Sequence, residues 1–208
     1  MFGTQNLGLF LVSAILLNLT PGQDTIYILG RSIAQGRRAG LLSVFGIISG
    51  CLVHAIAASL GLSTILATSA TAFLVVKFVG AAYLVYLGIR MLLRPPKGTT
   101  LTPEFGQSRP WVIFRAGLLT NLLNPKVALF FLSFLPQFVD PLTDFKIGAF
   151  LFLGALFICT GTIWCLILAL SASAISRRLR DRGSFAAWIR RATGAVFVGL
   201  GVKLAVGK

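Results

Sequence analysis

Two short polar stretches, each built around a proline, interrupt long apolar runs. The first runs from Asn18 to Asp24 around Pro21, and the second runs from Asn121 to Lys126 around Pro125. Proline has no amide proton and its ring clashes with the preceding turn, so a helix stops before it and can begin again with proline in its first position. We therefore expect two transmembrane helices that are broken near mid-depth, with the two breaks facing each other.

Both stretches carry side chains suited to a helix restart. Thr20 is expected to be the N-cap of the first restart, with Pro21 and Gln23 at the first and third helical positions, which is the spacing of a capping box. Asn124 is expected to cap the second restart, which begins at Pro125. Each new half-helix would then point its positive end toward the interior of the membrane.

Asp24 and Lys126 would place a carboxylate and an ammonium where hydrocarbon tolerates charge only around a cavity or beside a partner. Asp24 could carry a proton or pair with a substrate ammonium, or it could merely complement the positive end of its own half-helix. Lys126 could meet a substrate carboxylate, Asp24 itself, or backbone carbonyls. We predict a substrate site for a small polar or zwitterionic solute, lined by Asn18, Thr20, Gly22, Gln23, Asp24, Asn121, Asn124 and Lys126.

The chain as a whole is too apolar for a soluble globule. Its 208 residues are 56% hydrophobic and 12% charged, whereas soluble domains carry about 25% charged residues. A bilayer-spanning helix needs about 20 apolar residues. Candidate spans lie at 6–30, 39–62, 70–92, 112–138, 147–172 and 186–206. They leave no room for a soluble catalytic domain, so we do not expect an enzyme.

The net charge of +14 would indicate nucleic-acid binding in a soluble protein, but here the cations gather in alternate loops. They are Arg31, Arg37 and Arg38 in the first connection, Arg90, Arg94, Lys97, Arg109 and Arg115 in the third, and Arg177, Arg178, Arg180, Arg182, Arg190 and Arg191 in the fifth. The positive-inside rule makes these loops cytoplasmic, which places both termini outside. We expect anionic lipids, and no nucleic acid, as partners of these arginines.

A proline-rich and threonine-rich segment at 94–110 divides the chain into two halves, 1–93 and 111–208. Each half has three predicted spans, and the first span of each half contains the proline break. An odd number of spans makes the second half enter the membrane from the opposite side, as in an inverted repeat with its site near the midplane. We predict an all-α membrane protein of six transmembrane helices in two inverted three-helix repeats.

Three further residues are candidates for the site. Gly46, Gly50 and His54 recur every four residues, so one helix face is small enough to pack closely against a neighbour. His54 would either donate a hydrogen bond across that contact or join Asp24 in proton coupling. Lys77 would snorkel to the headgroups or point inward, and Tyr83 would be a site residue or an interface aromatic.

Cys51, Cys159 and Cys165 lie in apolar segments and lack the CxxC spacing. Neither a disulfide framework nor a metal site is indicated, and we expect no cofactor. The N-terminus has no positively charged segment before its apolar run, so we expect that run to be retained as a span.

These motifs, in this order, resemble those of the lysine exporter (LysE) superfamily, and more closely its homoserine/threonine resistance (RhtB) branch. The matching segments are Thr20 to Asp24, Arg31 to Gly40, the row from Gly46 to His54, Lys77 to Gly88, Asn121 to Lys126, and Pro136 to Phe138. Gln23 replaces the second proline of the family's usual Pro-Gly-Pro. The resemblance implies a bacterial inner-membrane exporter of amino acids driven by the proton gradient, and we keep a homodimer among the expected assemblies.

The leading interpretation is a secondary transporter that exports a small neutral amino acid, similar to homoserine, threonine or leucine, in exchange for protons. A cationic substrate would need a second buried acid, and the predicted spans contain only Asp24. The alternatives are export of a cationic amino acid or a metal cation on the same fold, and an intramembrane redox or hydrolytic enzyme. The enzyme is disfavoured because paired cysteines and a G-x-S-x-G motif are missing.

Overall fold

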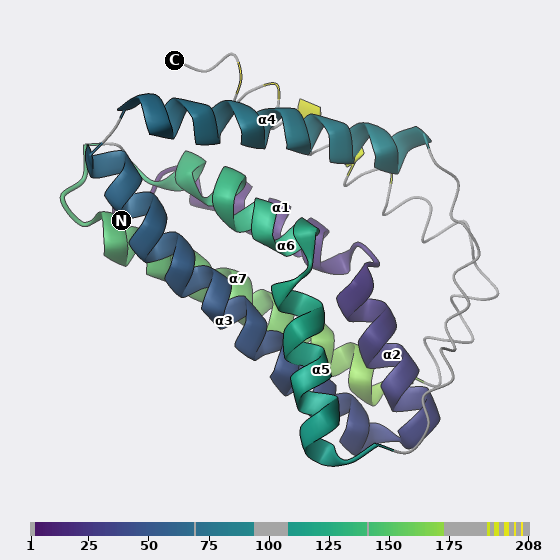
Figure 1. Cartoon of the computed structure of the whole chain (residues 1–208). Coiled ribbons are helices and arrows are strands. Elements are labelled where there is room, and N and C mark those ends of the chain that lie inside the picture. Colours follow the sequence, from purple (N-terminus) through teal and green to yellow (C-terminus); the bar gives the residue numbers. More distant parts are fainter. Residues whose placement is uncertain are drawn as a thin grey trace.

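A computed structural model describes residues 3–68, 70–93, 108–140 and 142–172, together with seven positions between 191 and 205. The elements, shown in Figure 1, are α1 (Leu7–Leu19), α2 (Gln23–Gln35), α3 (Arg37–Thr68), α4 (Ala70–Leu93), α5 (Pro110–Leu122), α6 (Pro125–Leu129), the π-helix η1 (Phe130–Phe134), the 3₁₀-helix η2 (Leu135–Phe138) and α7 (Lys146–Leu170). Across these ranges the only β-type pairing is an isolated bridge between Thr4 and Val139. The predicted all-α class is confirmed for the described part of the chain.

Two of the candidate spans are broken helices, as the two prolines predict. The axes of α1 and α2 meet at 48°, and α5 meets the segment Pro125–Phe138 at 46°. The helices α3 and α7 are each long and apolar enough to cross a membrane without a break. The sixth predicted span and the linker at 94–107 lie outside the described residues apart from scattered positions, so six spans and the inverted repeat stay predictions.

The first break is built differently from the predicted capping box. Thr20 ends α1, and its hydroxyl donates to the carbonyl of Leu16 at 2.7 Å. Its backbone is extended, with φ −68° and ψ 119°, because the residue before a proline is excluded from the helical region. The next helix begins at Gln23 with Gly22 as an N-cap that has no side-chain cap bond. The prediction that Thr20 caps α2 is therefore wrong.

The second break follows the prediction. Asn124 is the N-cap of α6, and its side-chain oxygen accepts from the backbone amide of Lys126 at 3.0 Å, with Pro125 in the first turn. Beyond α6 the helix widens into the π-turns of η1 and then tightens into η2, which contains Pro136. Proline inside a helix removes an amide donor and crowds the preceding turn, so an irregular ladder is expected there.

The end of α2 departs from the prediction at Arg31. This residue was expected in a cytoplasmic loop, but it lies inside α2 and is only 6% exposed. Its guanidinium donates to Ser108 Oγ at 3.1 Å and lies 5.5 Å from the centre of the Tyr27 ring. These contacts give the charge a polar partner and an aromatic face, so α2 continues to Gln35. Only Gly36, with φ 82°, separates α2 from α3.

The two broken spans are tied to each other at both ends. At one end the backbone amide of Gln5 donates to Phe138 O at 2.8 Å, and that of Asp140 donates to Gly3 O at 2.9 Å. At the other end the Tyr27 hydroxyl donates to Ile113 O at 2.7 Å, alongside the contact of Arg31 with Ser108. The first end is held by these backbone pairs, with the Gln5 side chain adding a bond to Gln137 O at 3.2 Å, and the second is held by side chains.

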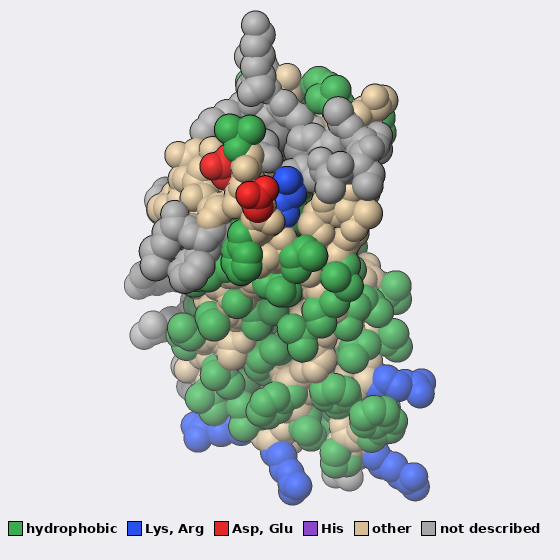
Figure 2. Space-filling model, turned by 90° about the vertical axis from the view of Figure 1, so that its left-hand side faces the viewer, with side chains coloured by type: hydrophobic (Ala, Val, Ile, Leu, Met, Phe, Trp, Pro, Cys, Tyr) green, Lys and Arg blue, Asp and Glu red, His purple; other side chains and the backbone are tan. Residues whose placement is uncertain are grey.

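Arginine side chains and acidic side chains lie at opposite ends of the molecule. Arginines 37, 38, 109 and 115 are exposed in the first turns of α3 and α5, whereas Asp140 and Asp144 lie between η2 and α7. Figure 2 shows most of the Lys and Arg side chains at one end of the face, the acidic side chains with one cation beside them toward the other, and a mostly hydrophobic surface between them. This arrangement is typical of a protein whose middle is surrounded by lipid.

The long helix α3 packs against α5 with almost no space between the backbones. A Cβ added to Gly46 would run into the carbonyl of Phe114, and a Cβ added to Gly50 would lie 2.8 Å from Asn121 Oδ1. On the facing helix, a Cβ on Gly117 would lie 2.9 Å from Ser43 O. The predicted close contact along the Gly46, Gly50 and His54 face is confirmed.

Two apolar clusters lie on either side of the breaks. The first is rich in phenylalanine and contains Phe10, Leu17, Val127, Phe130, Phe131, Phe134, Phe138, Phe150 and Phe157. The second contains Tyr27, Ile28, Leu29, Val44, Ile47, Cys165 and Leu168. The polar residues of the breaks form a layer between these clusters, so the site is held by packed side chains above and below.

Gly46→Ala should destabilise the fold, because the new methyl group meets backbone atoms of α5 that cannot move aside. Overpacking of this kind costs about 1 to 3 kcal/mol, and we expect the detergent-solubilised protein to melt several degrees lower. Gly61→Ala in the same helix is the matched control, since a Cβ there meets nothing within 4 Å. Equal melting temperatures for the two variants would contradict the close packing.

Candidate functional site

Lys126 joins the two breaks. Its ammonium donates to Leu17 O at 2.7 Å and to Thr20 O at 2.9 Å, at the end of α1. The last carbonyls of a helix have no donors of their own and carry its negative partial charge. Lys126 starts from the positive end of α6, so reaching across to α1 gives its charge a favourable site. Of the partners considered for Lys126, this structure shows the backbone carbonyls.

Asn121 makes the reciprocal connection. It lies in the last turn of α5, is completely buried, and donates from Nδ2 to Asp24 Oδ2 at 2.8 Å. Asp24 lies in the first turn of α2, where the positive end of the helix favours a carboxylate. Each broken span therefore supplies a side chain to the break of the other, and Figure 1 shows the two bends together at the centre of the molecule.

Asp24 and Lys126 do not neutralise each other directly. Within the described residues, no salt bridge shorter than 4.0 Å joins the two side chains. Each is instead held by uncharged groups, namely an asparagine amide and two backbone carbonyls. A negative and a positive group are thus kept near each other but apart.

His54 is connected to this arrangement through Asn121. Its Nε2 lies 3.3 Å from Asn121 O, and since a carbonyl can only accept, Nε2 carries the proton in that bond. The imidazole also stacks on Phe131, with ring centres 6.0 Å apart. The predicted hydrogen bond across the helix contact is confirmed. His54 is not part of the cavity wall described next.

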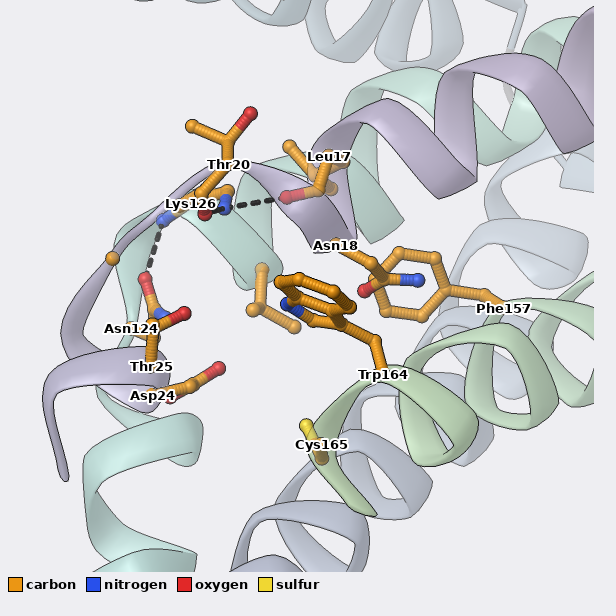
Figure 3. Close-up of a pocket in the computed structure, with 12 residues that line it drawn as sticks. Leu17, Asn18, Thr20, Asp24, Thr25, Asn124, Lys126, Phe157, Trp164 and Cys165 are labelled. Atoms are coloured by element: carbon orange, nitrogen blue, oxygen red, sulfur yellow. Dashed lines mark hydrogen bonds between the residues drawn. The ribbon is translucent and has the colours of Figure 1, made fainter. Parts of the chain in front are cut away.

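A cavity of about 40 Å³ lies between the breaks and α7. It is lined by Leu17, Asn18, Thr20, Gly22, Asp24, Thr25, Asn124, Lys126, Val127, Phe157, Trp164 and Cys165, most of which are labelled in Figure 3. A water needs at least about 10 to 15 Å³ of such volume, so this space suits a few water molecules. Of the predicted site residues, Asn121 lies behind Asp24, and Gln23 is exposed outside the wall.

The sequence did not predict the contribution of α7. Phe157, Trp164 and Cys165 line the cavity, and Asn18 Nδ2 donates to Thr160 Oγ1 at 3.1 Å. Residues three, four and seven apart share one helix face. A tryptophan in the middle of a predicted span, on the same face as a threonine one turn earlier, was the available signal.

Two other predicted candidates cannot be placed. Lys77 and Tyr83 belong to α4, but their side chains lie outside the described residues. For the described part of the chain, no group of three or more His, Cys, Asp or Glu side chains could hold a metal ion.

Comparison with known proteins agrees with this geometry. The model of the LysE type translocator family matches residues 15–208. The chain belongs to this family. The predicted resemblance is confirmed, and membership makes this protein a membrane translocator rather than an enzyme.

Several relatives match over nearly their whole length. An uncharacterized membrane protein of Pseudomonas aeruginosa is 33% identical over 202 residues, covering 94% of this chain and 93% of its own. A leucine efflux protein of Klebsiella pneumoniae is 33% identical over 209 residues, covering 98% and 96%. A leucine efflux protein of Salmonella typhimurium is 30% identical over the same length and coverage. No solved structure matches the chain.

Lys126→Met should loosen the first break, because it removes the ammonium that bridges the carbonyls of Leu17 and Thr20. A hydrogen bond to a charged group contributes about 1.5 to 3 kcal/mol, so we expect a lower melting temperature. We also expect faster hydrogen–deuterium exchange in peptides that span residues 15–25. Lys146→Met, at the start of α7, is the matched control. Unchanged exchange across the break in the Lys126 variant would refute this role of the lysine.

Proposed function

We propose that this protein is a secondary transporter that exports a small neutral amino acid across the bacterial inner membrane in exchange for protons. The observation that carries the proposal is the pair of opposite charges, Asp24 and Lys126, held apart on the wall of one cavity between two broken helices. Broken helices near the midplane mark substrate sites in several transporter folds. The relatives named leucine efflux proteins support an amino acid as the substrate.

The charges fit the two ends of an amino acid. Asp24 would pair with the substrate ammonium, and Lys126 would pair with its carboxylate, while Asn18 and Asn124 complete the polar wall. The cavity of about 40 Å³ is too small for leucine, so the site must widen during transport. Lys126 offers a physical route, because turning toward a carboxylate would release the carbonyls that it ties at the end of α1.

Asp24 is the best candidate for the proton carrier. It is the only acid on the described cavity wall, and a protonated carboxyl is far less costly than a carboxylate in an apolar layer. Asn121 fixes one carboxylate oxygen, and His54 touches the backbone of the same asparagine. We propose that proton uptake by Asp24 weakens its interaction with the substrate ammonium. We also propose that His54 contributes to this step through its hydrogen bond to Asn121, which holds Asp24.

A neutral substrate is favoured over a cationic one. Lysine or arginine would bring a second positive charge into a cavity whose described wall holds one carboxylate and already contains the ammonium of Lys126. The same surplus of positive charge disfavours a metal cation. We place the arginine-rich end in the cytoplasm, and both termini outside, by the positive-inside rule.

Asp24→Asn should abolish the stimulation of efflux by a pH gradient, because the amide cannot take up a proton. The assay is efflux of labelled leucine, threonine, homoserine or lysine from proteoliposomes, with and without an imposed gradient. We expect gradient-driven efflux of the neutral amino acids to fall at least tenfold. Asp144→Asn, in the exposed connection before α7, is the matched control and should behave as the wild type.

The outcomes separate the alternatives. Gradient-stimulated efflux that survives Asp24→Asn would show that another group carries the proton, even though amino acid export would stand. Preferential efflux of lysine by the wild type would instead favour the cationic substrate. No efflux of any amino acid would overturn the proposed function.

A further inference from the structure

Trp164 brings an unused hydrogen-bond donor to the cavity. Its indole nitrogen is buried and has no hydrogen-bond partner among the described residues, while its ring forms part of the wall. An indole N–H can only donate, and a buried tryptophan usually finds an acceptor for it. The ring stands on α7 opposite the first turn of α2, and Figure 3 shows it across the cavity from Asp24.

Asp24 brings an unused acceptor to the same space. Its Oδ2 accepts from Asn121, whereas its Oδ1 is buried and unpartnered. Other buried polar atoms without partners in the described chain, such as those of Ser13 and Ser32 and Oδ1 of Asn121 behind Asp24, belong to residues that do not line the cavity. The cavity thus presents one free donor and one free acceptor on facing walls.

Apolar side chains complete the wall beside these two groups. Leu17, Val127 and Phe157 line the cavity together with the faces of the Trp164 ring. Phe157 is itself fixed by stacking on Phe130, with ring centres 4.5 Å apart. A ligand that matches these groups offers an acceptor to the indole, a donor to the carboxylate and an aliphatic group to the apolar side chains.

We propose that Trp164 determines substrate specificity by donating its indole N–H to the α-carboxylate of a zwitterionic amino acid with an aliphatic side chain. Asp24 Oδ1 accepts from the α-ammonium of the same molecule. This inference rests on the proposed function and extends it, since Lys126 shares the carboxylate with Trp164. Amines that lack the carboxylate leave the indole unpaired, and an aliphatic side chain can lie against the apolar part of the wall formed by Leu17, Val127 and Phe157.

The test uses the full-length protein and two probes, L-leucine and L-leucinol. Leucinol keeps the ammonium and the side chain of leucine, but it has an alcohol in place of the carboxylate. Binding of both probes is measured by calorimetry for the wild type, Trp164→Phe and Trp111→Phe. Trp111 is 65% exposed at the start of α5, so its replacement is the matched control.

We expect Trp164→Phe to weaken leucine binding about tenfold, which is the usual effect of removing one partner of a buried hydrogen bond. Leucinol binding should stay within about twofold, and Trp111→Phe should match the wild type. If Trp164→Phe weakens the binding of both probes equally, the ring only packs against the side chain of the ligand. If it weakens the binding of neither, Trp164 takes no part in substrate recognition. Both results overturn the proposal.

A second measurement avoids dependence on the folding of the Trp164 variant. In a protein that carries Trp111→Phe and Trp188→Phe, Trp164 is the only remaining tryptophan. Saturating leucine should shift its emission to longer wavelength, as expected for a newly hydrogen-bonded indole, and leucinol should not. Identical spectra with both probes would contradict the assignment. Leucine efflux by the wild type without these signatures overturns only the role of Trp164, whereas absence of efflux overturns the proposed function as well.

Discussion

A helix that ends inside a membrane exposes backbone groups that lipid cannot satisfy, and this constraint governs the whole centre of the protein. Each break exposes the carbonyls of one half-helix and the amides of the next. Lys126 satisfies carbonyls at the end of α1, and Asn121 holds the carboxylate at the start of α2. Each broken span therefore supplies a side-chain contact to the break of the other.

The close contact between α3 and α5 makes this exchange feasible. The glycines along α3 let α5 approach until Asn121 lies against the backbone of Gly50 and the ring of His54. Gly50 and His54 thereby hold Asn121 on one side, while its side-chain amide faces Asp24 on the other. The phenylalanine-rich cluster holds the other side through rings that stack between η1 and α7. The polar layer is therefore packed against other side chains at its back and borders the cavity at its front, where Lys126 and α7 both line the wall.

The two prolines were enough to predict where the spans break, because proline excludes a continuous helix whatever surrounds it. The cap at Thr20 could not be predicted with the same certainty, since its hydroxyl can serve the helix that ends as well as the one that begins, and here it bonds Leu16. Arg31 was assigned to a loop because a buried arginine needs partners, and its contact Ser108 is remote in sequence. The position of Trp164 on the cavity wall was not predicted because α7 is apolar on all sides, so periodicity does not reveal which face meets the cavity.

The two ends of the broken spans are closed by different kinds of bond, and this difference bears on how the protein can change over generations. Pairs between main-chain atoms of Gln5, Phe138 and Asp140 do not require particular side chains, although Gly3 must stay glycine because its φ is 65° and an added Cβ would meet Thr143. The opposite end relies on the hydroxyl of Tyr27 and the guanidinium of Arg31. A substitution at Tyr27 or Arg31 removes one of these contacts, so sequence change at that end acts directly on how the two broken spans are held together.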